Sequence, residues 1–167
     1  LVDRLRGLVG FLRRTNRSRA TPARGSVSHV IILDGTMSMM DVGCETNVGL
    51  IYKLVDEVAH VAPVNVFYEA GVQWTDWSAT LNIIEGRGIN RQIRRAYGWL
   101  ATRYRPGGRI YLVGYSRGAY AARSLAGVID QVGLLRRRDA TERMIREAYR
   151  HYRGETPPEV SAEFRAA

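Results

Sequence analysis

Residues 109–127 limit the possible folds of this 167-residue chain more than any other segment does. An apolar, strand-like run over 110–113 leads into Gly-Tyr-Ser-Arg-Gly, and an alanine-rich, helix-like segment follows at once. Such a sharp turn carries the central serine at its tip, and its crowding explains the glycines Gly114 and Gly118. The pattern predicts a nucleophile elbow with Ser116 as the catalytic nucleophile of acyl transfer. The alternative is an ordinary glycine-rich turn, because Gly-x-Ser-x-Gly also arises by chance.

Two backbone segments near the elbow are candidates for an oxyanion hole. The helix predicted to begin near Arg117 directs its free N–H groups and positive dipole end at the serine. The turn Asp34-Gly35-Thr36 after the first predicted strand offers the second half, with Gly35 and Thr36 as the expected donors. Asp34 itself is expected at the edge of the site. The alternatives are an Asx turn and a phosphate or metal role for Asp34, but no second ligand cluster supports a metal or cofactor.

Strand-like and helix-like segments alternate along the whole chain. The strands are expected at 27–33, 64–68 and 110–113, and the helices at 46–60, 89–105, 117–132 and 141–152. This rhythm, with strands apolar on both faces, predicts an α/β fold with a mostly parallel sheet covered by helices, and it argues against a bundle or a β-sandwich. Because ligands gather at the carboxyl ends of such strands, the elbow is expected to meet the turn at 34–36 and the loop around Gly71.

Length and composition indicate one globular unit. The chain is 46% hydrophobic, its single Cys44 excludes an internal disulfide, and no apolar run approaches the roughly 20 residues that cross a bilayer. We expect a basic leader and linker over 1–26, a core over 27–152 and a polar C-terminal tail over 153–167. Since no secretory signal is recognisable, a cytoplasmic location is expected.

The formal net charge of +9 is concentrated at one end. Residues 1–25 hold seven Arg and one Asp, a net of +6, which leaves +3 for the other 142 residues. This distribution argues against nucleic acid as a partner. Leucines at helical spacing between the arginines predict transient contact of residues 1–14 with an anionic membrane surface, and the alternative is a solvated leader helix. A basic membrane-surface binding protein is therefore one rival function.

Longer stretches around the elbow resemble one known family. The segments are H-V-I-I-L-D-G-T, E-T-N-V-G-L-I-Y-K-L, Y-E-A-G-V and R-P-G-G-R-I-Y-L-V-G-Y-S-R-G-A-Y-A-A-R-S-L-A-G-V-I. Over residues 29–150 the chain is similar to the catalytic domain of the α/β-hydrolase family that includes the phospholipase effectors of bacterial type VI secretion. The resemblance implies a three-layer fold, export by a secretion apparatus and a serine esterase that cleaves lipid esters, with Ser116 as nucleophile.

The resemblance also implies a triad acid and histidine in later motifs that this sequence lacks. After Ser116 the candidates are Asp130, Asp139 and His151. Asp130 lies 14 residues along the elbow helix, about 20 Å from the serine, and His151 is expected on a helix surface. We also expect His29 at the wrong end of its strand and His60 at the far end of its helix. None of these residues is expected to complete a triad.

The missing triad residues predict a hydrolase core that is truncated after the elbow and the helices that follow it. The rival interpretation is a catalytically inactive, truncated homologue that acts as an interaction module. In either case the elbow strand would expose an edge, which predicts self-association unless the helix at 141–152 covers that edge.

Overall fold

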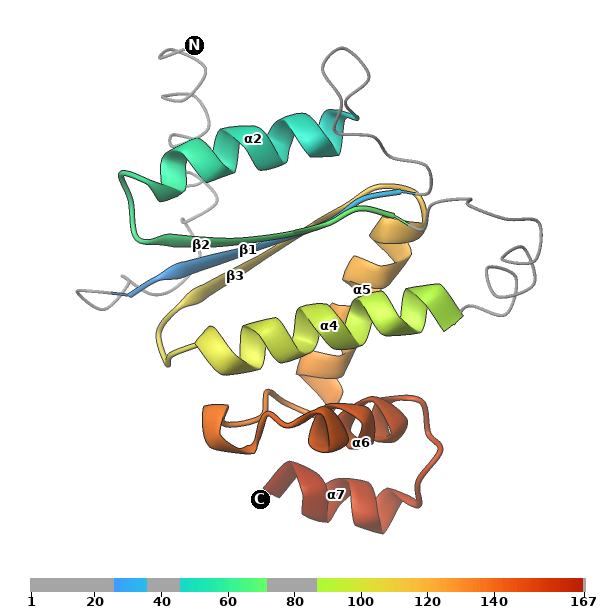
Figure 1. Ribbon diagram of the computed structural model, residues 1–167. Helices are drawn as coiled ribbons and strands as arrows, with labels where there is room; N and C mark the ends of the chain where they lie inside the picture. Colours follow the sequence, from blue (N-terminus) through green and yellow to red (C-terminus); the bar gives the residue numbers. More distant parts are fainter. Residues whose placement is uncertain (1–25, 36–45, 72–86, 167) are drawn as a thin grey trace.

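A computed structural model describes residues 26–35, 46–71 and 87–166, which form a sheet with helices on both faces (Figure 1). Its strands are β1 (Ser28–Leu33), β2 (Val64–Glu69) and β3 (Arg109–Gly114). Its helices are α2 (Asn47–Ala59), α4 (Arg87–Arg103), α5 (Arg117–Gln131), the short 3-10 helix η2 (Arg137–Asp139), α6 (Glu142–Tyr152) and α7 (Pro158–Ala166). The predicted α/β class with a parallel sheet is confirmed over the described residues.

The sheet is parallel, in the order β2-β1-β3, and its strands are level at both ends. Ser28 is opposite Val64 and Arg109, and Leu33 is opposite Glu69 and Gly114. The central strand β1 is buried on both faces because its side chains alternate between two apolar clusters.

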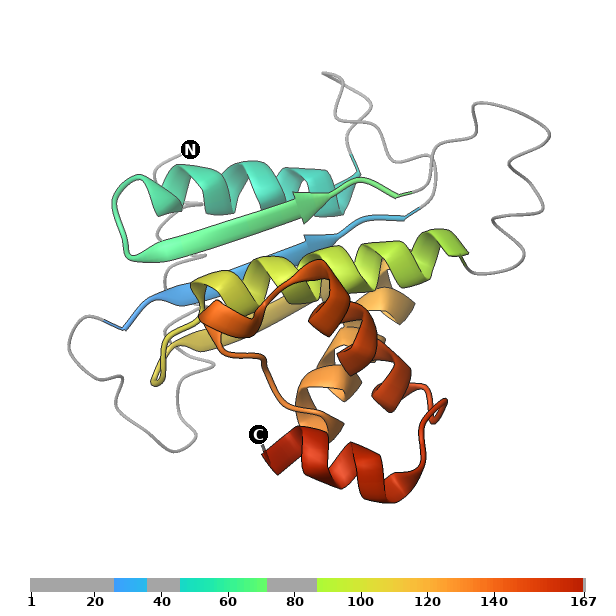
Figure 2. The same cartoon turned by 60° about the horizontal axis from the view of Figure 1, so that its bottom comes forward.

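Opposite faces of the sheet are covered by different helices (Figure 2). Val30 and Ile32 belong to the cluster that includes residues of α2, while Ile31 and Leu33 pack in the larger cluster built from α4 and α5. The result is three layers, helix, sheet and helix, as expected for an α/β-hydrolase core.

The helix ends follow the local sequence signals. Thr46 caps α2, since its hydroxyl accepts the Gly49 N–H at 2.9 Å, and Pro63 follows the end of that helix. Gly133, with φ of 95°, follows the end of α5, where a left-handed residue favours glycine. Helix α4 begins at Arg87, two residues before its predicted start at Ile89.

The C-terminal part of the chain contains a helix that the sequence analysis assigned to a polar tail. Helix α7 lies beside α6 (Figures 1 and 2), and its Phe164 packs against the main core cluster. Helix α6 itself packs on α4 and α5. The suggestion that residues 141–152 cover the edge of the elbow strand is therefore wrong, because the apolar side of α6 is used by these two helices.

Some expectations fall outside the described residues, namely the leader over 1–25, Thr36 and Cys44. In the segments that the structure does describe, no helix is long and apolar enough to span a bilayer.

Candidate active site

Ser116 lies at the turn between β3 and α5, in a backbone conformation that residues other than glycine rarely adopt. Its φ is 53° and its ψ is −123°, and it is the only non-glycine residue with positive φ in the described parts of the chain. Such geometry costs about 1–3 kcal/mol and persists where the surrounding structure enforces it. The placement expected for Ser116 at a strand-to-helix turn is thus observed, and the residue is exposed.

The two elbow glycines allow β3 and α5 to approach each other and β1. A Cβ added to Gly114 would lie 2.5 Å from the carbonyl oxygen of Gly118. A Cβ added to Gly118 would collide with the carbonyl of Leu33, at the end of β1. These contacts are with backbone atoms, which cannot move aside, so the turn requires glycine at both positions.

Gly35, from the turn after β1, lies directly against the elbow. A Cβ added there would be 3.3 Å from the Ser116 Cβ and 3.0 Å from the Tyr115 ring. The Gly35 N–H, however, donates to Asp34 Oδ1 at 2.7 Å, so it is already paired. Arg117 is the first residue of α5, where a backbone N–H has no partner within the helix, so its N–H is the more available of these two candidate oxyanion donors.

Asp34 connects three elements under the site. Its side chain is 1% exposed and accepts hydrogen bonds from the Gly35 N–H, the Thr46 hydroxyl at 2.5 Å and the Tyr68 hydroxyl at 3.0 Å. These donors fix the turn after β1 against the start of α2 and the end of β2. The carboxylate is therefore a positioning group, and among the described residues no cluster of His, Cys, Asp and Glu could hold a metal ion.

Ser116 opens onto a cavity of about 650 Å³ between the starts of α4 and α5 and the end of α6. Its lining consists of Ile89, Asn90, Ser116, Arg117, Tyr120, Ser124, Tyr149, Tyr152 and Arg153. The Tyr149 hydroxyl donates to Asn90 Oδ1 at 2.8 Å and so joins α6 to α4. Burial raises the pKa of Tyr149, which keeps the phenol neutral. Gly71, expected at the site edge, is buried after β2 and does not line this cavity.

Neither His29 nor His60 lines this cavity. His29 lies near the amino end of β1, at the opposite edge of the sheet from Ser116, and it is buried against the rings of Trp99 and Tyr104. His60 follows α2, and its Nδ1 is 2.7 Å from the carbonyl of Asp56. The expectation that neither histidine reaches the serine agrees with these positions.

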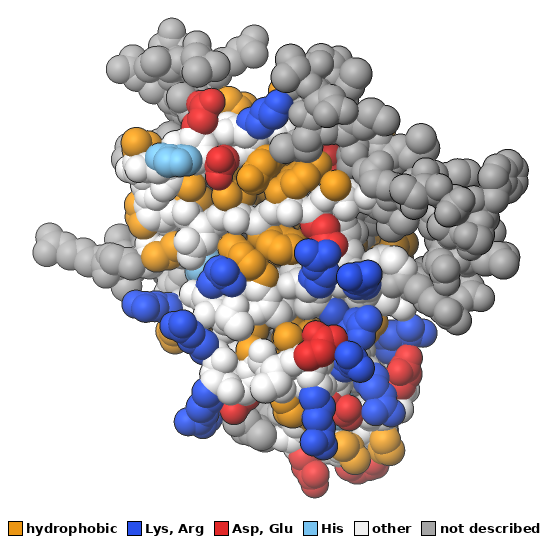
Figure 3. Space-filling view, in the orientation of Figure 1, with side chains coloured by type: hydrophobic (Ala, Val, Ile, Leu, Met, Phe, Trp, Pro, Cys, Tyr) orange, Lys and Arg blue, Asp and Glu red, His pale blue; other side chains and the backbone are white. Residues whose placement is uncertain are grey.

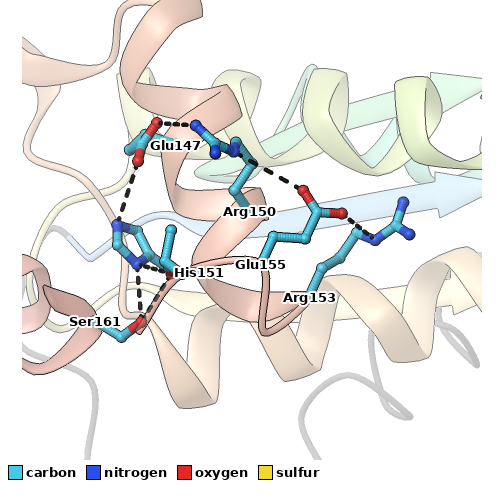
Figure 4. A network of polar contacts seen from close by, with 7 residues as sticks. Glu147, Arg150, His151, Arg153, Glu155 and Ser161 are labelled. Carbon is cyan, nitrogen blue, oxygen red and sulfur yellow. Dashed lines mark hydrogen bonds and ion pairs between the residues drawn. The ribbon is translucent and has the colours of Figure 1, made fainter. Parts of the chain in front are cut away.

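His151 is buried rather than on the helix surface, which corrects the sequence expectation. Its Nδ1 lies 2.6 Å from the Thr156 hydroxyl and 2.9 Å from the Ser161 hydroxyl (Figure 4). The imidazole ring also contacts the ring of Phe164. Nε2 is 3.8 Å from a Glu147 carboxylate oxygen. These contacts direct the imidazole toward α7 and the segment before it, so His151 joins α6 to α7. Periodicity alone could not show this, because the partners follow the end of α6.

Comparison with known proteins agrees with this arrangement. Residues 28–166, from β1 to α7, match the family described as the catalytic domain of Tle1-like type VI secretion phospholipase effectors. The chain is also 28% identical over 138 residues to the uncharacterized protein YEL023C of Saccharomyces cerevisiae (strain ATCC 204508 / S288c), an alignment that covers 74% of this chain and 20% of the yeast protein. The chain thus spans about a fifth of the length of that relative. No solved structure matches it. The chain belongs to the family of Tle1-like phospholipase effector catalytic domains.

Proposed function

We propose that the chain carries the nucleophile of a serine hydrolase that cleaves carboxylic esters of lipids. The observation that carries this proposal is the backbone of Ser116, held at positive φ between β3 and α5 at the mouth of a cavity. The fold tolerates this strained conformation at a residue that glycine could replace, which is typical of a site where the side chain has a chemical role. The family description supports phospholipids as the lipid class and a secretion system as the route of delivery.

In the proposed reaction the Ser116 Oγ attacks the ester carbonyl carbon while a general base accepts the hydroxyl proton. The carbonyl oxygen becomes an oxyanion that the Arg117 N–H and the amino end of α5 stabilise. When the tetrahedral intermediate collapses, the alcohol leaves with the proton from the base, and the acyl group stays on Ser116 until water repeats the sequence and releases the carboxylic acid.

No histidine or carboxylate lines the cavity beside Ser116 among the described residues. All three histidines lie in the described residues and away from this cavity, and Asp130 is exposed far along α5. The proposal therefore includes a general base that the described residues do not bring to Ser116. The same observation favours a second candidate, an inactive homologue that serves as an interaction module.

Labelling with a fluorophosphonate, followed by peptide mass spectrometry, tests the proposal directly. We expect slow but selective modification of Ser116, because the elbow exposes its Oγ next to the oxyanion donors, and no modification of the Ser116→Ala chain. Ser28, Ser124 and Ser161 are internal controls, since they lie within regular elements. Modification of Ser116 no faster than of these serines would reject the hydrolase assignment and favour the interaction module.

A further inference from the structure

The cavity beside Ser116 carries positive charge that the proposed hydrolysis does not use. Arg117 lines it from the first turn of α5 and Arg153 from the end of α6, and no carboxylate is among its described lining residues. The Nε of Arg153 lies 3.0 Å from Glu155 Oε1, in a half-exposed ion pair (Figure 4). Glu155 is shared, since its other oxygen is 3.9 Å from Arg150 Nε. A surface pair of this kind is weak, so an anionic ligand can compete for the guanidinium.

The rest of the cavity wall is uncharged and combines apolar with polar groups. Tyr120, Tyr149 and Tyr152 contribute rings and hydroxyl groups, and Tyr120 is 63% exposed at the rim. The positive charge of Arg153 lowers the pKa of Tyr149, but burial has the larger effect and raises it. The phenol therefore stays protonated at neutral pH and does not neutralise the two arginines. Arginine side chains are also frequent on the surface around α4 and α6 (Figure 3).

We propose that this cavity binds the phosphate of a glycerophospholipid, with Arg117 and Arg153 as the residues that recognise the anion. The assignment rests on the proposed function. It adds to that function which part of the substrate, the phosphate, the cavity binds. Guanidinium groups bind phosphate oxygens through paired, charge-assisted hydrogen bonds. In a glycerophospholipid the phosphate and the ester are attached to the same glycerol, so a phosphate held in this cavity brings an ester carbonyl to Ser116, which lines the same wall.

Calorimetric binding to the Ser116→Ala chain tests the assignment without turnover. The probes are dihexanoyl phosphatidic acid below its micelle concentration, dihexanoylglycerol as the uncharged match, and inorganic phosphate as the free form of the same anion. We expect the phosphatidic acid to bind most tightly, and Arg153→Gln and Arg117→Gln each to weaken it about tenfold. Inorganic phosphate binding as tightly as the lipid would overturn the head-group assignment, as would dihexanoylglycerol binding equally well.

Glu155→Gln is the matched control for Arg153→Gln, because it breaks the same ion pair and keeps the guanidinium. Binding should be retained or tightened in Glu155→Gln. If both variants weaken binding of the phosphatidic acid equally, the ion pair acts only on local structure and the proposal is overturned. Thermal melting of each variant checks that it is folded. Since turnover is not measured, failure here leaves the role of Ser116 standing, and failure of Ser116 labelling leaves phosphate binding standing.

Discussion

At the scale of single residues, the elbow combines one strained residue with neighbours that enforce the strain. Ser116 has positive φ, while Gly118 is pressed against the carbonyl of Leu33 and Gly35 against the serine itself. The two backbones meet so closely that the turn cannot relax without separating α5 from β1. The serine therefore remains in a conformation that glycine would adopt at lower cost.

Ser116→Gly is expected to stabilise the fold by about 1 kcal/mol, because relief of the strained φ exceeds the entropy cost of a glycine. Ser124→Gly, in the interior of the same helix, should instead destabilise it by about 0.5 kcal/mol. Urea unfolding followed by circular dichroism measures both changes. If the two substitutions destabilise equally, the backbone of Ser116 is not strained.

The burial of His29 predicts that the folded protein loses stability in acid. Burial, with a smaller effect of Arg103, lowers the pKa of His29 in the folded protein, and neither ring nitrogen has a hydrogen-bond partner among the described residues. The unfolded chain then binds a proton first, so the free energy of unfolding should fall as the pH drops below about 6.5, by at most about 1.4 kcal/mol per pH unit from this group. His29→Leu should flatten this slope between pH 7 and 5. An equally steep fall in the free energy of unfolding in His29→Leu would assign the acid sensitivity to other groups.

At the scale of elements, α6 and α7 depend on a polar contact that local sequence does not encode. His151 fixes the connecting segment through Thr156 and α7 through Ser161, next to the ring of Phe164. Most residues of α7 are exposed, so this small set of contacts holds the helix in place.

His151→Ala is expected to release α7 from α6. Hydrogen exchange of the amides in 158–166 should speed up about tenfold or more, because the half-buried hydroxyls of Thr156 and Ser161 lose their hydrogen bonds to the imidazole and keep only the one between them. Helix α2, on the other face of the sheet, should be unaffected. The control is Arg146→Ala on the same helix, which removes only an exposed pair with Glu142. Unchanged exchange in α7 after His151→Ala would show that Phe164 alone holds this helix.

The elements that sequence predicted well are those whose signals are local. Apolar runs predicted the three strands, and the starts of α2 and α6 were predicted to within one residue, where Thr46 and Thr141 cap them in the structure. The roles of Asp34 and His151 could not be predicted in this way. Asp34 is bonded to residues 12 and 34 positions away, and the burial of His151 depends on a helix whose own apolar pattern is short. In both cases tertiary contacts determine the environment of the side chain.

At the scale of the whole molecule, the sheet has two edges. In the described residues β3 pairs with β1 on one side, and no strand lies on its other side. An edge strand can pair with a strand of another chain through its backbone N–H and C=O groups. The self-association expected from the sequence therefore remains a prediction.

Sedimentation velocity should show a dimer that forms at micromolar concentration. Hydrogen exchange at high and low concentration identifies the edge used: amides of β3 should become more protected in the dimer, while those of β1, already paired on both sides, should not change. A monomer at all concentrations, with equal exchange in β3, would contradict the prediction.

The level pairing of the three strands has a consequence for changes in chain length. Each strand has six residues, and Leu33 and Gly114 end opposite each other. Insertion of one residue into β1 would advance Asp34 and Gly35 by about 3.3 Å and exchange the faces of every side chain after it. Insertions and deletions should therefore be tolerated between the strands but not within them. Within a strand, a change of one residue would separate the turn after β1 from the elbow at Ser116.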